Sequence, residues 1–291
     1  MEPLPENYQC LSGIEKQRLL WANIEATKYT NDMLPDKSLS RYFWDAVASG
    51  FFWSKEYSRK TYLHVSDETP DGRKKIFHCF GTACQVELKP TDDHPYTGIF
   101  QSGACGILRT GLIFKLKSCT PGMGFKFLVD GQPSVNIPTF PSISGQLDDN
   151  NFFKMASSNT MANDFNTILL KTMRWAVNRA VKSLKVNGLK FDRQPMGCLA
   201  ETRRDGTRIE QSRAPFEVLF APTPEVQISS AAEPDYRIKM ADVPSGSFIY
   251  NLLAKENADA IPKKIGEIHS TSAFVASRYG DEKLFFQHNT H

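Results

Sequence analysis

The chain has 291 residues, of which 41% are hydrophobic and 23% are charged, a composition typical of a folded globular protein. Its 35 basic and 32 acidic residues give a net charge of +3, too balanced for the basic surface that nucleic acids require. The sequence contains no apolar run of about 18 residues and no secretory leader, so we expect a cytoplasmic protein with no transmembrane segment.

The six cysteines are scattered along the chain and none forms a CxxC pair. We interpret them as reduced thiols, because a chain of this length can bury a core without disulfides. No two histidines have the spacing of zinc ligands, so the sequence does not indicate a zinc site.

The N-terminal part, residues 1–60, predicts two helices. Ser12 and Glu15 have the S-x-x-E spacing of a capping box, and the apolar residues that follow at helical spacing predict a helix over about 13–28. A second apolar stripe predicts a helix that begins near residue 36 and ends at 49–50.

From about residue 74 the pattern changes to short apolar runs separated by Gly, Pro and Asp, which is typical of consecutive strands. Asp130-Gly131 is a hairpin-turn signal. Several strands joined by tight turns predict an antiparallel barrel or sandwich. The expected strands are 75–88, 96–101, 106–114, 122–129 and 134–140.

The helical spacing returns over 151–185, a polar excursion follows over 190–213, and strand patterns resume at 214–221, 248–253, 265–272 and 283–288. This order favours a single α+β domain over 1–291, closed around an antiparallel β-barrel. Its expected parts are N-terminal helices (1–60), a first barrel half (70–141), a helical insertion (150–190) and closing strands (214–289).

Three polar residues interrupt the apolar strand patterns. His78 lies between apolar residues at strand spacing, so we expect its side chain to face the interior, where a histidine is more often structural than functional. Arg109 needs an anion if it is buried, and Asn136 needs a hydrogen-bond partner. We expect the three side chains to converge on one cavity.

Two of these segments resemble motifs of the catalase-like superfamily. In that superfamily the motif Arg-x-x-His-x-x-Gly supplies a distal histidine, and Lys75, His78 and Gly81 have the same spacing here, with lysine in place of arginine. Arg109 occupies a position similar to that of an arginine that holds a haem propionate.

Further segments resemble the same superfamily in the same order. Residues 121–128 and the turn that follows are similar to the segment that leads to the distal asparagine, which corresponds to Asn136. Residues 235–238, 265–268 and 284–286 are similar to the closing barrel strands. The resemblance covers about 70–140 and 214–289 and implies a catalase-like barrel.

The resemblance also implies a function in lipid metabolism, the haem-dependent isomerisation, cleavage or reduction of an organic or lipid hydroperoxide. The enzyme would be an oxidoreductase or a hydroperoxide isomerase or lyase. His78 would act as general acid and base, and Asn136 would orient the bound oxygen. Lys75 and Arg109 would neutralise the two propionates.

The usual iron ligand is missing, because the superfamily's Arg-x-x-x-Tyr motif does not occur in this sequence. Tyr250 and Tyr279 are the conceivable replacements, and the metal ligand stays open. One alternative is a haem-free barrel that binds an apolar small molecule, with or without a proton transfer catalysed by His78 and Asn136. The other is a binding or structural scaffold. A homo-oligomer is compatible with each.

Overall fold

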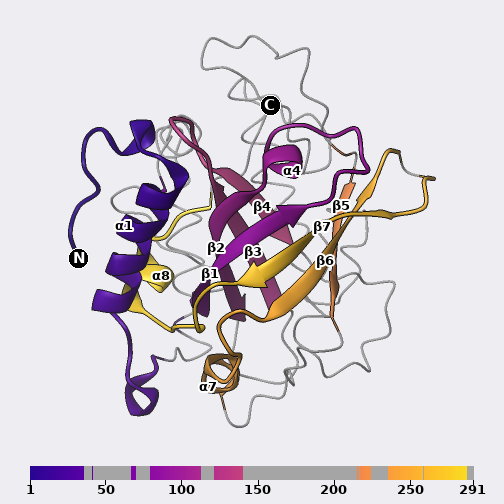
Figure 1. The fold of residues 1–291 in the computed structure, drawn as a ribbon. Coiled ribbons are helices and arrows are strands. Elements are labelled where there is room, and N and C mark those ends of the chain that lie inside the picture. The colour runs from indigo at the N-terminus through magenta and orange to yellow at the C-terminus, as the bar shows by residue number, and fades with distance from the viewer. Residues whose placement is uncertain are drawn as a thin grey trace, which may run out of the picture.

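Seven antiparallel strands form one curled sheet that carries few helices, and the protein is a mixed α/β protein (Figure 1). The structure is a computed structural model that describes residues 1–35, 41, 67–69, 79–112, 121–139, 215, 217–223, 235–257 and 259–286.

Neighbouring strands of the sheet are antiparallel and follow the order β4-β3-β2-β1-β7-β6-β5. The two halves of the chain therefore meet where β1 pairs with β7. The strands are β1 (Phe80–Pro90), β2 (Ala104–Leu112), β3 (Pro121–Leu128), β4 (Val135–Thr139), β5 (Glu217–Pro222), β6 (Phe248–Lys255) and β7 (Lys263–Ser270).

The sheet curls into a half-barrel. Phe125 of β3 and Phe220 of β5 stack with ring centroids 4.2 Å apart, although β2, β1, β7 and β6 lie between their strands in the sheet. Such a contact requires the two sides of the sheet to bend toward each other. We call the side that carries these rings the inner face and the opposite side the outer face. The predicted antiparallel β architecture is confirmed, in the form of a curled half-barrel of seven strands.

Helix α1 (Gly13–Ala26) covers the outer face, where Leu20 and Ile24 pack in a cluster with Ile107 (Figure 1). Both hydrogen bonds of the capping box between Ser12 and Glu15 are formed, which confirms the predicted helix start. The apolar spacing in the sequence therefore identified the helix and its buried side.

The hairpin turn ties this helix to the sheet. Asp130-Gly131 connects β3 and β4 as predicted, and Gly131 has a φ of 61°, which glycine adopts without strain. The Asp130 carboxylate accepts a hydrogen bond from the backbone N–H of Gly13 at 2.6 Å. A Cβ at Gly13 would lie 2.3 Å from the carbonyl oxygen of Leu128, so the helix start can approach the strand only with glycine there.

The remaining helices are short and lie around the sheet. α8 packs beside α1 on the outer face, while α4 and α7 lie near opposite ends of β1 (Figure 1). These helices are η1 (Tyr8–Cys10), η2 (Asn31–Met33), α4 (Ile99–Ser102), α7 (Tyr236–Ala241) and α8 (Arg278–Glu282).

The strand predicted over 96–101 is wrong, because residues Ile99–Ser102 form helix α4. Gly98 and Gly103 flank the helix with φ values of 64° and 75°, which break the extended backbone on both sides. Within the helix, Ile99 and Phe100 are buried, and four residues are too few to show a helical period in the sequence.

Two closing strands suggested by the sequence also differ from the structure. Asp235 caps helix α7 through the backbone N–H of Arg237, so residues 236–241 are helical. In the segment 283–288, described as far as 286, Leu284 forms only an isolated bridge with Glu68. In the first case the expectation came from the resemblance, and the side-chain cap at Asp235 starts a helix instead.

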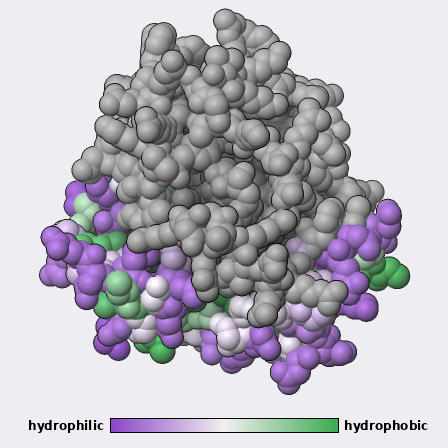
Figure 2. Space-filling view, turned by 90° about the horizontal axis from the view of Figure 1, so that it is seen from above, coloured by the Kyte–Doolittle hydropathy of each residue, from purple (hydrophilic) through white to green (hydrophobic). Residues whose placement is uncertain are grey.

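The predicted helix over 36–50, the helical insertion over 150–190 and the polar excursion over 190–213 lie outside the described residues, Arg41 excepted. Among the helices that the structure describes, none is long and apolar enough to cross a membrane. In the view of Figure 2, the described part of the surface is mostly hydrophilic, with small separated hydrophobic groups.

Candidate functional site

Two buried charged side chains project from neighbouring strands onto the outer face. Lys126 lies between the inner-facing residues Phe125 and Phe127 of β3, and Arg109 follows the inner-facing Leu108 of β2. Because side chains alternate along a strand, both charges point away from the apolar interior and toward the segments that cover the outer face.

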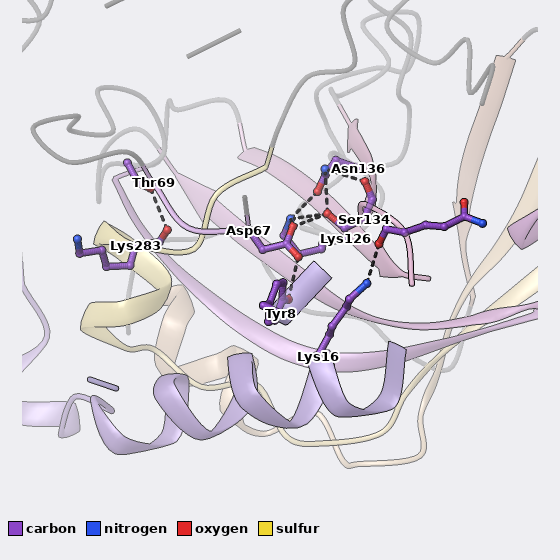
Figure 3. Close-up of polar contacts among 9 residues, drawn as sticks. Tyr8, Lys16, Asp67, Thr69, Lys126, Ser134, Asn136 and Lys283 are labelled. Atoms are coloured by element: carbon purple, nitrogen blue, oxygen red, sulfur yellow. Dashed lines mark hydrogen bonds and ion pairs between the residues drawn. The ribbon is translucent and has the colours of Figure 1, made fainter. Parts of the chain in front are cut away.

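Lys126 belongs to a polar cluster that we call the Lys126 network, formed by Tyr8, Asp67, Lys126, Ser134 and Asn136 (Figure 3). The Lys126 ammonium donates to Oδ1 of Asp67 at 2.5 Å and to Oδ1 of Asn136 at 2.8 Å. It donates a third bond to Oγ of Ser134 at 3.1 Å. All three ammonium protons therefore have acceptors.

The Asp67 carboxylate is equally well satisfied. Its Oδ1 accepts from Lys126 and from the Ser134 hydroxyl, and its Oδ2 accepts from the Tyr8 hydroxyl at 2.8 Å. The side chains of Asp67 and Lys126 are 3% and 0% exposed. A buried ion pair in which each partner also has other hydrogen bonds is the arrangement that keeps such charges tolerable away from water.

Burial and ion pairing shift the pKa values of Lys126 and Asp67 in opposite directions. Burial lowers the pKa of Lys126, an effect that the nearby Asp67 carboxylate reduces. Burial raises the pKa of Asp67, but the Lys126 ammonium and the hydrogen bonds from Lys126, Ser134 and Tyr8 together bring it below its usual value. Burial and the Asp67 charge raise the pKa of Tyr8, which stays a neutral donor. The network thus holds a carboxylate as a strong acceptor.

Hydrogen bonds of the short segment 67–69 hold Asp67 in this position. Thr69 donates its backbone N–H and its hydroxyl to the carbonyl of Lys283, and Phe285 donates its backbone N–H to the carbonyl of Asp67. The Tyr279 hydroxyl also donates to Glu68 at 2.7 Å. Helix α8 and the residues after it therefore fix the carboxylate beside Lys126.

Arg109 belongs to a second group on the same face. Its guanidinium donates to Oδ1 of Asp281 in α8 at 3.0 Å, and the same oxygen accepts the backbone N–H of Gly81 at 2.9 Å. A Cβ built on Gly124, the cross-strand partner of Arg109, would lie 2.9 Å from the ring of Phe286. The same ring lies 5.2 Å from Nζ of Lys126, so it fills the space between the two groups.

The structure describes three of the predicted site residues, Arg109, Asn136 and Tyr250, and does not bring these three together. Arg109 and Asn136 lie on the same face of the sheet, but each is engaged by a different ionic partner, Asp281 and Lys126, and Phe286 packs between the two groups. The expected cavity shared by these two side chains is therefore not observed. His78 and Lys75 lie outside the described residues.

Tyr250 lies on the inner face instead. Its ring contacts Phe125 and Phe220 edge-on, at centroid distances of 6.0 and 5.9 Å, and its hydroxyl donates to the sulfur of Met123 at 3.2 Å. Burial, followed by the neighbouring Cys84, raises the pKa of Tyr250 well above its usual value. The phenol is therefore protonated in these surroundings.

These positions show whether the described residues could serve one haem together. Haem is planar, and a single haem cannot contact Arg109 and Asn136 on the outer face and also Tyr250 on the inner face without passing through the sheet. The described residues of the prediction therefore do not fit one haem.

Among the residues of the Lys126 network, Asn136 was identified from the sequence and the others were missed. Lys126 itself carried the signal used for Arg109, a single charge within an otherwise apolar strand. Asp67 and Tyr8 carried none, because their importance comes from contacts with residues more than 50 positions away. Asp281, the partner of Arg109, lies 172 positions from it and was missed for the same reason.

No group of three or more histidine, cysteine and acidic side chains that could hold a metal occurs among the residues with described positions. Comparisons of the chain with protein-family models, with curated proteins and with solved structures found no match.

Proposed function

We propose that the protein is a haem-independent half-barrel of the catalase-like type that binds an apolar small molecule against its inner face. The observation that carries this proposal is the separation of charge between the two faces. Both buried charged side chains of the described strands, Arg109 and Lys126, lie on the outer face in ion pairs. An occupant of the inner face would therefore meet an apolar wall.

The chemistry of the inner face defines the class of ligand. Its central feature is the parallel stack of Phe125 and Phe220, with an interplanar angle of 7° and the Tyr250 ring against the edges of both. Offset stacking and edge contacts favour hydrocarbon and conjugated groups. The polar groups beside them are the Tyr250 hydroxyl and the Cys84 thiol, which are neutral at physiological pH. An uncharged or weakly polar lipid-like molecule suits this surface.

A haem-dependent reaction of an organic or lipid hydroperoxide is the second hypothesis, and it rests on the sequence resemblance alone. It requires His78 as the proton-transfer group, a residue outside the described part of the chain. It also requires Arg109 and Asn136 to serve one cofactor, whereas each has its own ionic partner. The described contacts therefore favour the haem-independent hypothesis.

A binding titration tests the proposal. The purified protein is titrated with cis-parinaric acid, a polyene whose fluorescence rises in an apolar site, and we expect saturable stoichiometric binding. Phe220→Leu should weaken this binding, because it removes one ring of the stack. Tyr8→Phe on the outer face is the matched control and should leave the affinity unchanged.

The same preparation separates the other hypotheses. A Soret band in the purified protein, or after addition of one equivalent of haemin, together with turnover of a lipid hydroperoxide, would support the haem-dependent reaction. A folded protein that binds neither parinaric acid nor haemin would be a structural scaffold, and the proposal would be wrong.

A further inference from the structure

One contact in the Lys126 network joins two residues that are direct partners across the β3–β4 hairpin. Lys126 and Asn136 face each other in the antiparallel register, with Nζ of Lys126 2.8 Å from Oδ1 of Asn136. An amine nitrogen at this distance from the amide oxygen also lies close to the amide carbon. The two strands hold this pair in place, so no large motion is needed for the nitrogen to reach that carbon.

A carboxylate lies at the same nitrogen. Oδ1 of Asp67 is 2.5 Å from Nζ of Lys126, so it can take a proton from the ammonium and leave a neutral amine. Ser134 links the other end of the path, because its hydroxyl donates to Asp67 and lies 3.4 Å from Nδ2 of Asn136. A proton taken at Lys126 therefore has a route to the amide nitrogen that would leave.

Water is excluded from these groups. The side chain of Lys126 is 0% exposed and that of Asp67 is 3% exposed, and the Phe286 ring lies 5.2 Å from Nζ. Burial also lowers the pKa of Lys126, which makes the neutral amine more accessible than it is in water. A buried amine beside an amide is protected from competing hydrolysis.

We propose that Lys126 and Asn136 are joined by an intramolecular isopeptide bond, formed by the folded chain itself with Asp67 as the catalytic carboxylate. Asp67 takes a proton from Nζ of Lys126, and the nitrogen lone pair attacks Cγ of Asn136. The resulting tetrahedral carbon then loses Nδ2, which leaves as ammonia after it receives this proton from Asp67 through Ser134. Nζ gives its second proton to the Asp67 carboxylate, so the new amide is neutral and keeps one N–H. One C–N bond forms, one C–N bond breaks, and no oxidant or reductant is required.

The bond would lock the hairpin at the outer face. Lys126 and Asn136 lie on β3 and on the edge strand β4, which pairs with β3 alone among the described strands. A covalent link between them would prevent β4 from separating even when the hydrogen bonds of the hairpin open. The reaction would be a self-modification that the chain carries out once, independent of any ligand on the inner face.

Mass spectrometry of the purified, folded protein tests the proposal. We expect an intact mass lower by one ammonia, about 17 Da, than the sequence requires after any loss of the initiator methionine. A cyclic imide at an asparagine loses the same mass, so digestion must locate the change. The expected product is a branched peptide that contains Lys126 and Asn136, with no tryptic cleavage after Lys126.

Two variants test the roles of Asp67 and Ser134, and a third variant serves as the matched control. Asp67→Ala retains both joined residues but removes the base, so the protein should keep its full mass. Ser134→Ala retains the Asp67–Lys126 ion pair and should slow the mass loss in a time course after refolding. Glu267→Gln removes the carboxylate of the exposed Lys264–Glu267 pair and should show the complete loss of ammonia.

The wild-type measurement decides the proposal even if Asp67→Ala does not fold. A folded wild-type protein with its full mass, or an ammonia loss that maps to a cyclic imide without Lys126, would overturn it. A branched peptide that persists in a folded Asp67→Ala variant would overturn the role assigned to the carboxylate.

Discussion

Different interactions stabilise the two faces of the half-barrel. The inner face is an apolar cluster to which all seven strands contribute, with the Phe125–Phe220 stack at its centre. The outer face has its own apolar cluster under α1 and α8, but it also buries the ions Arg109 and Lys126. Apolar packing accepts many partners of suitable shape, whereas a buried ion accepts only a partner with the opposite charge.

The two faces therefore differ in how strictly they determine which segments of the chain pack against them. On the outer face, Asp67 and Asp281 come from segments 59 and 172 positions away from the basic residues that they contact. A wrong segment in either place would leave a buried charge without its counter-ion, at a cost of several kcal/mol. The ion pairs therefore determine which distant segments dock on the sheet, while the inner face supplies most of the apolar burial.

The largest effect is expected where a buried ion loses its partner. Asp67→Asn removes the counter-ion of Lys126 together with the base proposed for the isopeptide reaction, so Lys126 stays buried, unlinked and without an opposite charge. We expect the free energy of unfolding to fall by about 3–5 kcal/mol, measured by urea denaturation at neutral pH.

Glu267→Gln is the matched control for this variant, because it breaks a lysine–carboxylate pair whose side chains are 42% and 31% exposed. Its effect should be within about 1 kcal/mol. Equal losses in the two variants would mean that burial does not distinguish the outer-face pair from a solvated one.

A smaller loss is expected from a neutral donor in the same network. Tyr8→Phe removes the hydroxyl that donates to the Asp67 carboxylate at 2.8 Å, and hydrogen bonds to charged groups contribute about 1.5–3 kcal/mol. Tyr29→Phe is the control, for which we expect a change within about 0.5 kcal/mol. Similar denaturation midpoints for Tyr8→Phe and the wild type would show that the network does not depend on its N-terminal member.

On the inner face, the loss of stability caused by a substitution should depend on the shape of the side chain and not on charge. Phe220→Leu keeps the site apolar but removes one ring of the parallel stack, so we expect a loss of about 1–2 kcal/mol. Thermal unfolding measures the effect, and it should be insensitive to salt. A loss as large as that of Asp67→Asn would remove the distinction between the two faces.

Periodicity and turn chemistry predicted most of the described fold. The capping box of α1 and the Asp130-Gly131 hairpin were visible because all of their determinants lie within a few residues of each other. Helix α4 was mistaken for a strand, because its four residues are too few to show a period and the flanking glycines were not taken as helix boundaries.

The candidate site was less predictable than the fold. The sequence marked Arg109 and Asn136 as polar groups in need of partners, and both have partners in the structure. It did not identify Asp281 as the partner of Arg109 or Asp67 as the counter-ion of Lys126, because ionic pairing across more than 50 positions leaves no local pattern. Strand alternation around Arg109 also does not say which of the two faces is the outer one.

The smallest expected effect concerns the start of α1, which covers the outer face. Ser12→Ala removes the side chain that accepts the backbone N–H of Glu15, so we expect a loss of about 1 kcal/mol. Ser245→Ala, at an exposed serine outside the helices, is the control. Ser12 also donates to the Glu15 carboxylate and lowers the pKa of Glu15, so this part of the contribution is present above the unfolded value of about 4.3 and is lost as the pH falls through the lower folded value. The difference between the wild type and Ser12→Ala should therefore shrink in acid, and a constant difference would mean that only the bond to the backbone N–H of Glu15 contributes.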